Sequence, residues 1–367
     1  MDTKIIAMYL PQFHCIPEND EFWGKGFTDW VSVKKATPVY KGQVQPRIPL
    51  NDNYYDLSEK ENVAWQAKLA KEYGVDGFGI YHYWFNNEKN ILTKPAEIIR
   101  DNKDIDITYF FAWDNGNWKR SWSNVQGNDW SPLEENTEKR GPEVLIPYIL
   151  GKEKDWENHF NYLLSHFKDE RYIKIDNKPV FIIYNYNEDL IPMCKYWNEL
   201  AIANGFAGVE IIYRYEKAYN IPKEFNQYYY QPLTAAWRNR ISVRKIFYKL
   251  MTKMNIKFIE KYDYDNVWKY IIRKAKKNKE KNIYHGGFVM YDDTPRRGEK
   301  GKIITGASPL KFKKYLKQLV DICQEQDKRF LFLTAWNEWG EGAYLEPDTT
   351  YGYSYLEAIR SIVIEEK

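Results

Sequence analysis

The feature that most constrains the fold of this 367-residue chain is an alternation of short β-rich runs with helix-like stretches. Eight runs occur, at residues 5–10, 77–83, 108–113, 180–184, 209–214, 227–230, 287–291 and 330–335. Helical patterns lie between them, for example at residues 58–73, 155–167, 189–204 and 308–326. Strands separated by helices pair in parallel, so eight such units predict a (β/α)8 TIM barrel. An open doubly wound sheet is the alternative, but no GxGxxG or GxxxxGK[ST] pattern follows the first strand.

The chain length suits one barrel, so we predict a single catalytic domain over residues 1–367. The N-terminal apolar run is too short for a signal peptide and is broken by Pro11, and no stretch approaches 18 consecutive apolar residues. Three widely spaced cysteines form no disulfide framework. We therefore expect the protein to stay in the cytoplasm, with peripheral attachment to the inner membrane as a further option.

One segment between the sixth and seventh predicted strands has its own charge balance. Residues 238–282 contain 15 Lys or Arg and 4 Asp or Glu. A basic amphipathic helix is predicted there because two side-chain types each recur every four residues. These are Lys245, Lys249, Lys253, Lys257 and Lys261, and Ile246, Leu250, Met254 and Phe258.

Three interpretations of this basic insertion remain open. The insertion could be a solvated helix packed on the barrel. Alternatively, residues 240–282 could contact an anionic membrane or bind another anionic polymer. Each basic residue near an anionic leaflet contributes about 1 kcal/mol. Nucleic acid is not expected as a partner, because the rest of the chain is acidic and no nucleic-acid module is visible.

Polar and aromatic residues gather at the ends of the predicted strands, which all open onto one face of a barrel. Aromatic residues make up 17% of the chain, and Tyr and Trp suit both a core and a surface that grips sugars. The candidates for substrate contacts are Tyr9, Gln12, His14, His82, Trp84, Trp113, Asp114, Asn115, Tyr291, Asp292, Arg296, Trp336 and Asn337.

Each group of candidates has a structural alternative. The histidines could bind hydroxyls or be satisfied strand-end residues, and the tryptophans could be stacking platforms or core. Asp114 and Asn115 could hold a sugar hydroxyl or cap a turn. In "MYDDTPRRGEK" (290–300), Asp292 and Asp293 could order a loop through ion pairs with Arg296 and Arg297, or the arginines could bind an acidic sugar or a diphosphate. With five His and no HxH or HExxH, we expect no catalytic metal and no cofactor.

The segment "TAWNEWGEGAYLEPD" (334–348) carries the strongest chemical signal, in Glu338 and Glu341. If the chain turns helically after the last strand, these side chains lie on one side with Cβ atoms roughly 5–6 Å apart. Two carboxyl groups so close separate in proton affinity, one ionised and one protonated. Glycoside cleavage needs such a pair, and a separation of roughly 5 Å favours retention of configuration.

Four strings resemble the WbsX-type, or glycoside-hydrolase-family-99-like, family found in bacterial polysaccharide loci. They are "FLTAWNEWGEGAYLEPD", "YLPQFHCIPENDEFWGKGFTDW", "DGFGIYHYWFN" and "FFAWDNGNW". The resemblance spans residues 9–347. The N-E-W-G-E-G segment is similar to the catalytic segment of the endo-α-mannosidases, but the longer run departs from theirs at Gly340, Ala343 and Tyr344.

The resemblance implies a retaining, endo-acting glycoside hydrolase that cleaves an α-mannoside-like bond through a 1,2-anhydro sugar. Glu338 would be the base on the sugar 2-hydroxyl, and Glu341 the general acid and then the base for water. The substrate would be a bacterial oligosaccharide or polysaccharide, with a lipid-linked precursor as one option.

Two other functions remain open. A glycosyltransferase for O-antigen, capsule or lipopolysaccharide would need a diphosphate site, for which only "YDYD" (262–265) loosely resembles a DxD motif. A non-catalytic carbohydrate-binding barrel is the third hypothesis.

Overall fold

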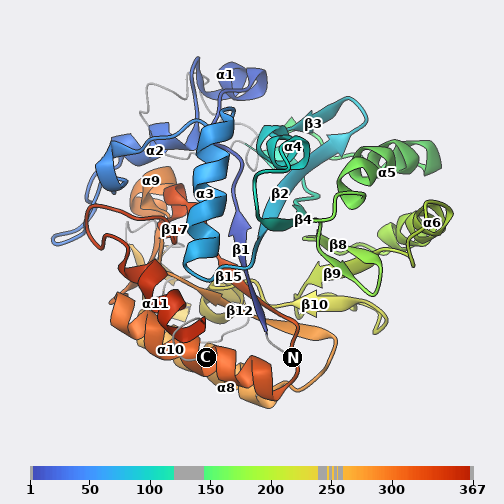
Figure 1. Cartoon of the computed structure of the whole chain (residues 1–367). Coiled ribbons are helices and arrows are strands. Elements are labelled where there is room, and N and C mark those ends of the chain that lie inside the picture. The colour runs from blue at the N-terminus through green and yellow to red at the C-terminus, as the bar shows by residue number, and fades with distance from the viewer. Residues whose placement is uncertain are drawn as a thin grey trace.

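The structure, a computed structural model, describes residues 3–119, 144–238, 246, 247, 250, 251, 254 and 259–363. Eight parallel strands form a closed barrel at its centre (Figure 1). They are β1 (Lys4–Tyr9), β2 (Gly77–Asn86), β4 (Thr108–Trp113), β8 (Lys178–Ile183), β9 (Glu210–Arg214), β10 (Asn226–Tyr228), β12 (Ile283–Phe288) and β15 (Phe330–Thr334). The barrel closes because Ile6 pairs with Gly77 of β2 and with Phe332 of β15. The (β/α)8 prediction is confirmed, and the open doubly wound sheet was the wrong alternative.

Helices surround the barrel and cover its outer face (Figure 1). They are α3 (Lys60–Glu72), α4 (Lys94–Asp101), α5 (Glu153–Phe167), α6 (Leu190–Ala203), α8 (Tyr264–Lys277), α10 (Pro309–Glu325) and α11 (Ser354–Val363). Helix α10 shows why they form: Ser308 caps it by accepting a hydrogen bond from the backbone of Lys311, and Pro309 occupies the first turn. Its Phe312, Leu316 and Leu319, spaced three or four apart, are buried against the barrel.

Shorter elements lie mostly in the loops that follow the barrel strands. They are α1 (Pro17–Trp23), α2 (Asp29–Lys35), β3 (Lys89–Ile91), β5 (Trp118–Lys119), β6 (Val144–Ile146), β7 (Lys174–Ile175), β11 (Glu260–Asp263), β13 (Tyr291–Asp292), α9 (Thr294–Arg297), β14 (Lys302–Thr305), β16 (Asn337–Glu338) and β17 (Ala343–Tyr344). Strands β11, β14 and β13 make a small separate sheet beside the barrel.

Side chains inside the barrel alternate along each strand with side chains that face the helices. Phe332 lies inside, with its ring centroid 5.0 Å from that of Tyr228 and 6.1 Å from that of Phe110 on other strands. Gly79 also faces inward, since a Cβ there would lie 2.9 Å from the Met8 sulfur. Both faces of these strands are therefore buried, the inner one in the barrel and the outer one under helices.

The seventh strand was predicted four residues too late, at 287–291 instead of Ile283–Phe288. Two glycines in its middle, Gly286 and Gly287, weaken its strand pattern in the sequence. The fold uses Gly286 for close approach, because a Cβ there would collide with the carbonyl oxygen of Tyr229 on the neighbouring strand.

The basic segment 238–282 divides into parts with different structures. Residues 264–277 form α8, which buries Val267, Trp268 and Ile271 against the barrel. Lys261 was predicted to continue the basic helix, but it lies in strand β11, with its ammonium 3.4 Å from the ring centroid of Tyr40. The other members of the lysine repeat and Phe258 lie outside the described residues.

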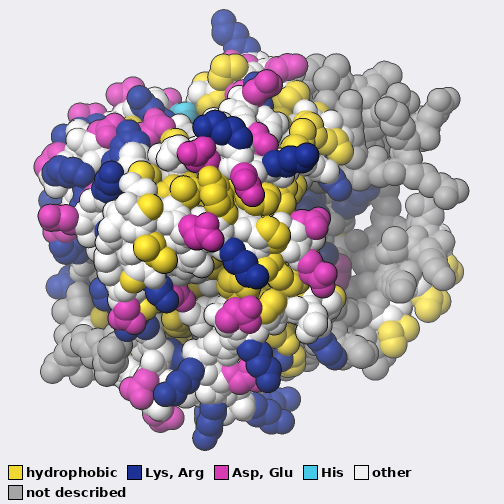
Figure 2. Space-filling model, turned by 90° about the vertical axis from the view of Figure 1, so that its right-hand side faces the viewer, with side chains coloured by type: hydrophobic (Ala, Val, Ile, Leu, Met, Phe, Trp, Pro, Cys, Tyr) yellow, Lys and Arg dark blue, Asp and Glu magenta, His cyan; other side chains and the backbone are white. Residues whose placement is uncertain are grey.

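No helix in the described part of the chain is both long enough and apolar enough to span a bilayer. On the face that lies to the right of Figure 1, Lys and Arg side chains are interspersed with Asp and Glu (Figure 2). Among the described residues of that face, the basic side chains therefore do not form a surface of one sign.

Candidate active site

Glu338 and Glu341 occupy a short turn that directly follows the last barrel strand. The chain leaves β15, forms β16, and then makes one 3-10 turn, Trp339–Glu341. In this type of helix residues three apart lie above one another, so both carboxyl groups face the same side. The helical turn predicted after the strand is thus present, in its tighter form. The Glu338 side chain is 5% exposed and that of Glu341 is 23% exposed.

One arginine holds both glutamates. The Nη2 atom of Arg296 lies 3.1 Å from Glu338 Oε2, and its Nη1 atom lies 2.9 Å from Glu341 Oε1. The same guanidinium donates from Nε and Nη2 to the two carboxylate oxygens of Asp29, each at 3.1 Å. A single planar fork therefore binds three carboxyl groups, an arrangement for which arginine is better suited than lysine. Arg296 therefore forms ion pairs, but with Asp29 and the glutamates and not with the aspartates of its own segment, where Arg297 pairs with Asp293 at 3.3 Å.

The barrel brings these groups together from distant parts of the chain. Asp29 begins α2 after β1, Arg296 lies in α9 after β12, and the glutamates follow β15. These three strands are neighbours, because β15 pairs with both β1 and β12. Their carboxyl ends meet on the face where (β/α)8 barrels carry their active sites. Asp29 was not among the sequence candidates, although it lies in the string "GFTDW" that carries the family resemblance.

Two glycines shape the turn that carries the acid pair. The backbone N–H of Gly340 donates to Asp29 Oδ2 at 3.0 Å, and a Cβ at this position would lie 2.7 Å from both Asp29 oxygens. Gly342 has φ +53°, a left-handed conformation that ends the turn at low cost only for glycine. The spacing of glycines in N-E-W-G-E-G thus follows from close packing at one position and backbone conformation at the other.

The carboxyl groups of Asp29, Glu338 and Glu341 are neutralised by only one positive charge, that of Arg296, in a buried environment. This arrangement favours the protonated form of one of the three carboxyl groups. Burial, and the nearby charge of Glu341, raise the pKa of Glu338 to about 8, although Arg296 opposes the shift. Burial alone would lower the pKa of Arg296, but Asp29, Glu338 and Glu341 raise it well above its usual range. The cluster at neutral pH therefore combines a charged guanidinium with a proton on Glu338.

Tyrosines line the space next to the acid pair. The hydroxyl groups of Tyr81 and Tyr230 lie 3.2 Å apart, and burial followed by nearby charges raises the pKa of each phenol. Glu338 or Glu341 is among those charges for Tyr81, Tyr83, Tyr230 and Tyr291. Of these, only Tyr291 was a sequence candidate. The signal that could have identified the others is the alternation of side chains along β2. Tyr81 and Tyr83 point to one face of this strand, and His82 and Trp84 point to the opposite face.

The structure places His82, Trp84 and Trp113 against the helix layer, away from the acid pair. His82 Nε2 lies 2.8 Å from Nε2 of His159 on α5, and Trp84 stacks on the same imidazole with ring centroids 4.4 Å apart. Trp113 packs edge-on against His159, with ring centroids 4.9 Å apart. Burial lowers the pKa of His82 to about 3, so it is neutral. Their position follows from strand alternation, which turns every second side chain of β2 and β4 outward.

Tyr9 belongs to a buried network behind the turn. Its hydroxyl donates to Gln66 Oε1 at 2.6 Å, and Gln66 Nε2 donates to Glu346 Oε1 at 2.7 Å. Glu346 Oε2 accepts from Tyr55 at 2.8 Å and from the indole N–H of Trp339 at 2.6 Å. Burial raises the pKa of Glu346 to about 7. This network fixes the indole ring of Trp339, which lies between Glu338 and Glu341 in the sequence of the turn.

Trp336 and Asn337 also support the turn. Trp336 is fully buried, with its ring centroid 5.3 Å from that of Phe78. The amide of Asn337 accepts from Leu10 N at 2.7 Å and donates to Leu10 O at 2.9 Å. The structure thus brings both residues close to the acid pair but engages Asn337 with the backbone of the first loop.

Two more candidates join loops. Asn115 donates to Asn185 O at 2.7 Å and accepts from Asn185 N at 2.8 Å. Asp292 accepts from the side chains of Gln43, Gln45 and Thr294 at 2.6–3.1 Å. Both side chains are committed to holding loops at the carboxyl end of the barrel.

The buried amide group of Gln12 and the Nδ1 atom of His14 have no hydrogen-bond partner among the described residues. Burial lowers the pKa of His14, and it raises that of Asp114 against the opposing charge of Arg214. Gln12 and His14 are therefore sequence candidates whose polar atoms remain available to a ligand.

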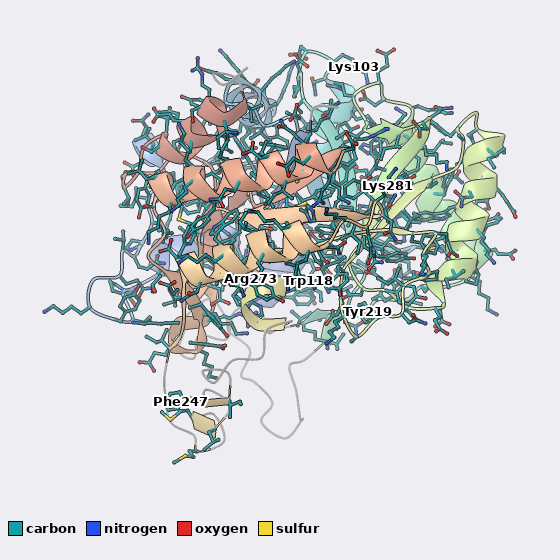
Figure 3. The ribbon with its side chains drawn as sticks, turned by 90° about the horizontal axis from the view of Figure 1, so that it is seen from below. Lys103, Trp118, Tyr219, Phe247, Arg273 and Lys281 are labelled. Atoms are coloured by element: carbon teal, nitrogen blue, oxygen red, sulfur yellow. The ribbon has the colours of Figure 1, made fainter. Side chains whose placement is uncertain are left out.

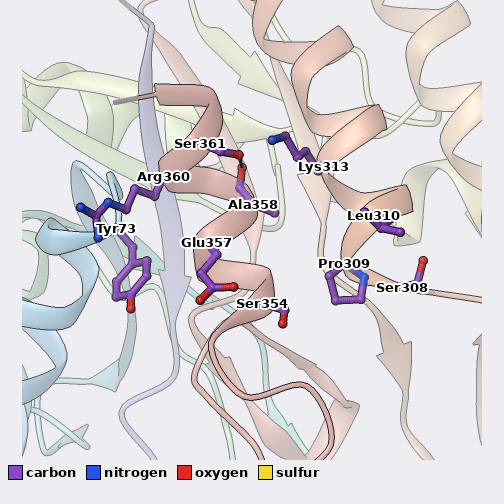
Figure 4. A pocket seen from close by; sticks show the side chains of 10 residues that line it. All are labelled: Tyr73, Ser308, Pro309, Leu310, Lys313, Ser354, Glu357, Ala358, Arg360 and Ser361. Atoms are coloured by element: carbon purple, nitrogen blue, oxygen red, sulfur yellow. Dashed lines mark hydrogen bonds between the residues drawn. The ribbon is translucent and has the colours of Figure 1, made fainter. Parts of the chain in front are cut away.

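A large cavity of about 690 Å³ lies elsewhere, between α10 and α11 (Figure 4). Tyr73, Lys313, Glu357 and Arg360 are among its lining residues, and none of the acid-pair residues is. Within the described ranges, no three His, Cys, Asp or Glu side chains are grouped so as to hold a metal ion. The chemical groups of interest are therefore those at the carboxyl end of the barrel.

Fold and site together define a closed (β/α)8 barrel with a carboxyl pair after its last strand. A solved structure described as a glycoside hydrolase-like protein matches with a TM-score of 0.60 at 14% identity, covering 99% of this chain and 94% of that one. The GH99 endo-alpha-mannosidase from Bacteroides thetaiotaomicron matches with a TM-score of 0.55 at 14% identity, covering 100% and 98%. At such low identity these likenesses establish the fold.

The chain belongs to the family described as Glycosyltransferase WbsX, whose model matches residues 5–359. The resemblance found in the sequence is thereby confirmed. The uncharacterized protein WxcX of Xanthomonas campestris pv. campestris (strain B100) is 29% identical over 376 aligned residues, covering 98% of this chain and 49% of WxcX. The chain spans about half the length of that relative.

Proposed function

We propose that this protein is a retaining, endo-acting glycoside hydrolase that cleaves an α-mannoside-like bond in a bacterial polysaccharide or oligosaccharide. The observation that carries the proposal is the placement of Glu338 and Glu341 on the two terminal nitrogens of one buried arginine. Both carboxyl groups then face one space at the carboxyl end of the barrel. The type of sugar follows from the family resemblance and from the mannosidase whose fold is similar.

Proton sharing within the pair suits acid and base work. In the free protein burial keeps the proton on Glu338, while Glu341 is the more exposed of the two. A bound sugar would cover Glu341 and remove water from it, which favours a shift of the shared proton to Glu341. Glu338 would then be ionised on Arg296, ready to act as a base.

The proposed reaction has two balanced steps. Glu338 takes the proton of the sugar 2-hydroxyl, whose oxygen attacks the anomeric carbon while Glu341 protonates the departing oxygen. A 1,2-anhydro sugar results. Glu341 then takes a proton from water, the water oxygen attacks the anomeric carbon, and Glu338 returns its proton to the 2-oxygen. Two inversions give retention, and each carboxyl group ends as it began.

Transfer of the sugar to another sugar is the second candidate, favoured by the description of the family. The aspartates of "YDYD" are occupied, since Asp263 caps α8 and Asp265 binds Lys311 at 2.6 Å and Tyr315 at 2.7 Å. Arg296 is bound to three carboxyl groups. This speaks against a nucleotide diphosphate at either place, so a transferase would use a donor without one, at the same acid pair.

We also propose a peripheral membrane contact within residues 240–282. The described side chains Ile246, Phe247, Leu250 and Met254 are 57%, 54%, 56% and 62% exposed. Phe247 lies on a segment that stands apart from the barrel body (Figure 3). Lysines precede or follow these residues in the sequence, and a mixture of apolar and basic side chains suits an anionic bilayer surface.

The test of the main proposal is incubation of the protein with α-linked mannan oligosaccharides of several lengths, followed by proton NMR of the anomeric signals. Internal cleavage with initial formation of the α-anomer supports it. New, longer products instead of hydrolysis would favour transfer. An initial β-anomer would rule out the retaining mechanism.

A further inference from the structure

A small cavity of about 190 Å³ lies next to the sheet of β11, β14 and β13. Tyr291 and Asp292 line it, and Tyr291 is also one of the tyrosines close to Glu341. Sites for drug-sized ligands begin at about 300 Å³. This cavity therefore suits one ring of a longer substrate that continues from the acid pair.

Arg47, in the loop between α2 and α3, supplies hydrogen-bond donors to this cavity. Its Nη1 atom lies 3.2 Å from the Met290 sulfur and 3.4 Å from the Tyr344 hydroxyl, both weak interactions. Its Nε atom is buried and finds no acceptor among the described residues. A buried donor without a partner is unfavourable, so a ligand oxygen that hydrogen-bonds to this guanidinium would remove an unfavourable contribution to the free energy.

The nearby carboxylates of Asp292 and Asp348 do not accept a hydrogen bond from Arg47, because both accept hydrogen bonds from neutral groups instead. Asp292 accepts from two glutamines and a threonine. Asp348 accepts from the hydroxyl of Tyr344 at 2.6 Å and from the backbone N–H groups of Thr350 and Tyr351 at 2.9 and 2.6 Å. The guanidinium thus stays available for a ligand.

The charged residues that line the cavity indicate whether its ligand is charged or neutral. Arg47 and Asp292 are the charged residues of the lining, with one charge of each sign. A carboxylate or phosphate would gain from Arg47 but would face Asp292, with Asp348 close behind. An uncharged polyol meets no such repulsion, and its hydroxyl oxygens can accept hydrogen bonds from the arginine. The rings of Tyr40 and Tyr351 provide the aromatic walls that suit a sugar face.

We propose that this cavity, the Arg47 subsite, binds one uncharged sugar ring of the substrate chain, with Arg47 donating to its hydroxyl groups. The inference rests on the proposed glycosidase function for the idea that the ring belongs to a substrate. Binding of a single sugar ring can be measured without turnover. An experiment can therefore refute the Arg47 subsite without refuting the glycosidase function, and the reverse.

Met290 offers a local probe, because it lines the cavity and the chain has only six methionines. The protein is labelled with [13C-methyl]methionine, and the Met290 signal is assigned with Met290→Leu. Methyl α-mannopyranoside, glucuronate and inorganic phosphate are titrated separately. We expect the mannoside to shift the Met290 signal and to leave that of Met193, buried on α6, unchanged.

Variants link the shift to Arg47. Arg47→Met should weaken the mannoside response at least tenfold, whereas Arg273→Met, at an exposed arginine of α8, should not change it. If Arg47→Met fails to fold, Val44→Trp serves instead, since Val44 lines the cavity and is 50% exposed. A mannoside response equal in these variants and the unmodified protein would overturn the proposal, as would no response at all. A stronger response to glucuronate or phosphate would overturn the assignment to an uncharged ring. Loss of hydrolysis with an intact response would refute only the glycosidase proposal.

Discussion

Gly340 and Asp29 are joined by a hydrogen bond of 3.0 Å although 311 residues separate them in the chain. The bond ties the turn of the acid pair to the first loop of the barrel, at a point where no side chain fits. Several properties of the protein should depend on this contact and on the arginine beside it.

Gly340→Ala should destabilise the protein by about 1–3 kcal/mol, because a methyl group would press on buried, ion-paired atoms. The added carbon would lie 2.7 Å from both Asp29 oxygens and would collide with Arg296. Urea unfolding measures the loss. Gly116→Ala is the control, since its nearest neighbour would be 3.4 Å away. Equal losses in the two variants would show that Gly340 is not specially constrained.

Glu341→Gln should lower turnover about 10²–10⁴-fold while substrate binding stays measurable, because the amide keeps the shape but cannot donate an acidic proton. Glu357→Gln, at an exposed glutamate of α11, is the control and should keep full activity. Initial rates and calorimetric titration of the same oligosaccharide test both statements. Normal turnover in Glu341→Gln would end the acid and base assignment.

Glu338 should make the stability fall as pH rises. Its pKa is raised from 4.5 to about 8 on folding, so the folded state holds this proton more tightly. The stabilisation is complete below pH 4.5 and is lost as pH increases towards 8, with a slope of at most about 1.4 kcal/mol per pH unit. Urea titrations between pH 5 and pH 8 give the free energy of unfolding at each pH. This free energy should fall less steeply with pH in Glu338→Gln than in the unmodified protein. An unchanged slope would contradict the raised pKa.

Asp29→Asn should lower turnover about tenfold or more, because the amide holds Arg296 less firmly and misplaces both glutamates. Removing this negative charge should also lower the pKa of Glu338, which Asp29 helps to raise. The pH at which Glu338-dependent stability is lost would then move downward. Asp106→Asn, at a largely exposed aspartate, provides the comparison. An Asp29→Asn protein with normal turnover and an unmoved pH dependence would leave Asp29 without a role at the site.

The membrane contact is testable with Phe247→Ser combined with Leu250→Ser. Binding to vesicles that contain about 30% anionic lipid should weaken, since apolar anchors and basic residues act together. Ile202→Ser is the matched control, because Ile202 is 61% exposed on α6. Deletion of residues 240–282 is unsuitable, since it would remove the buried helix α8. Equal vesicle binding by all three proteins would dismiss the contact.

The barrel could be predicted from the sequence because most of its strands and helices have a local signature. The acid pair could be predicted for the same reason, since Glu338 and Glu341 share one turn. Asp29 could not, because only the closure of β1 on β15 brings it to Arg296.

The orientation of strand residues was the other obstacle. Barrel strands are buried on both faces, so β2 shows no contrast between apolar and polar positions from which to choose the inner side. His82 and Trp84 look like ligand-binding residues but face α5, whereas Tyr81 and Tyr83 face the acid pair. In the seventh strand, glycines selected for tight packing hid the strand signal.

The pairing of the first barrel strand with the last also has a consequence for biosynthesis. A chain still emerging from the ribosome contains Asp29 early, Arg296 late and both glutamates later still. The cluster is complete only when β15 has left the exit tunnel and inserted between β12 and β1. A nascent chain that ends before β15 therefore cannot carry the assembled cluster, because it lacks both glutamates and the strand that joins β12 to β1.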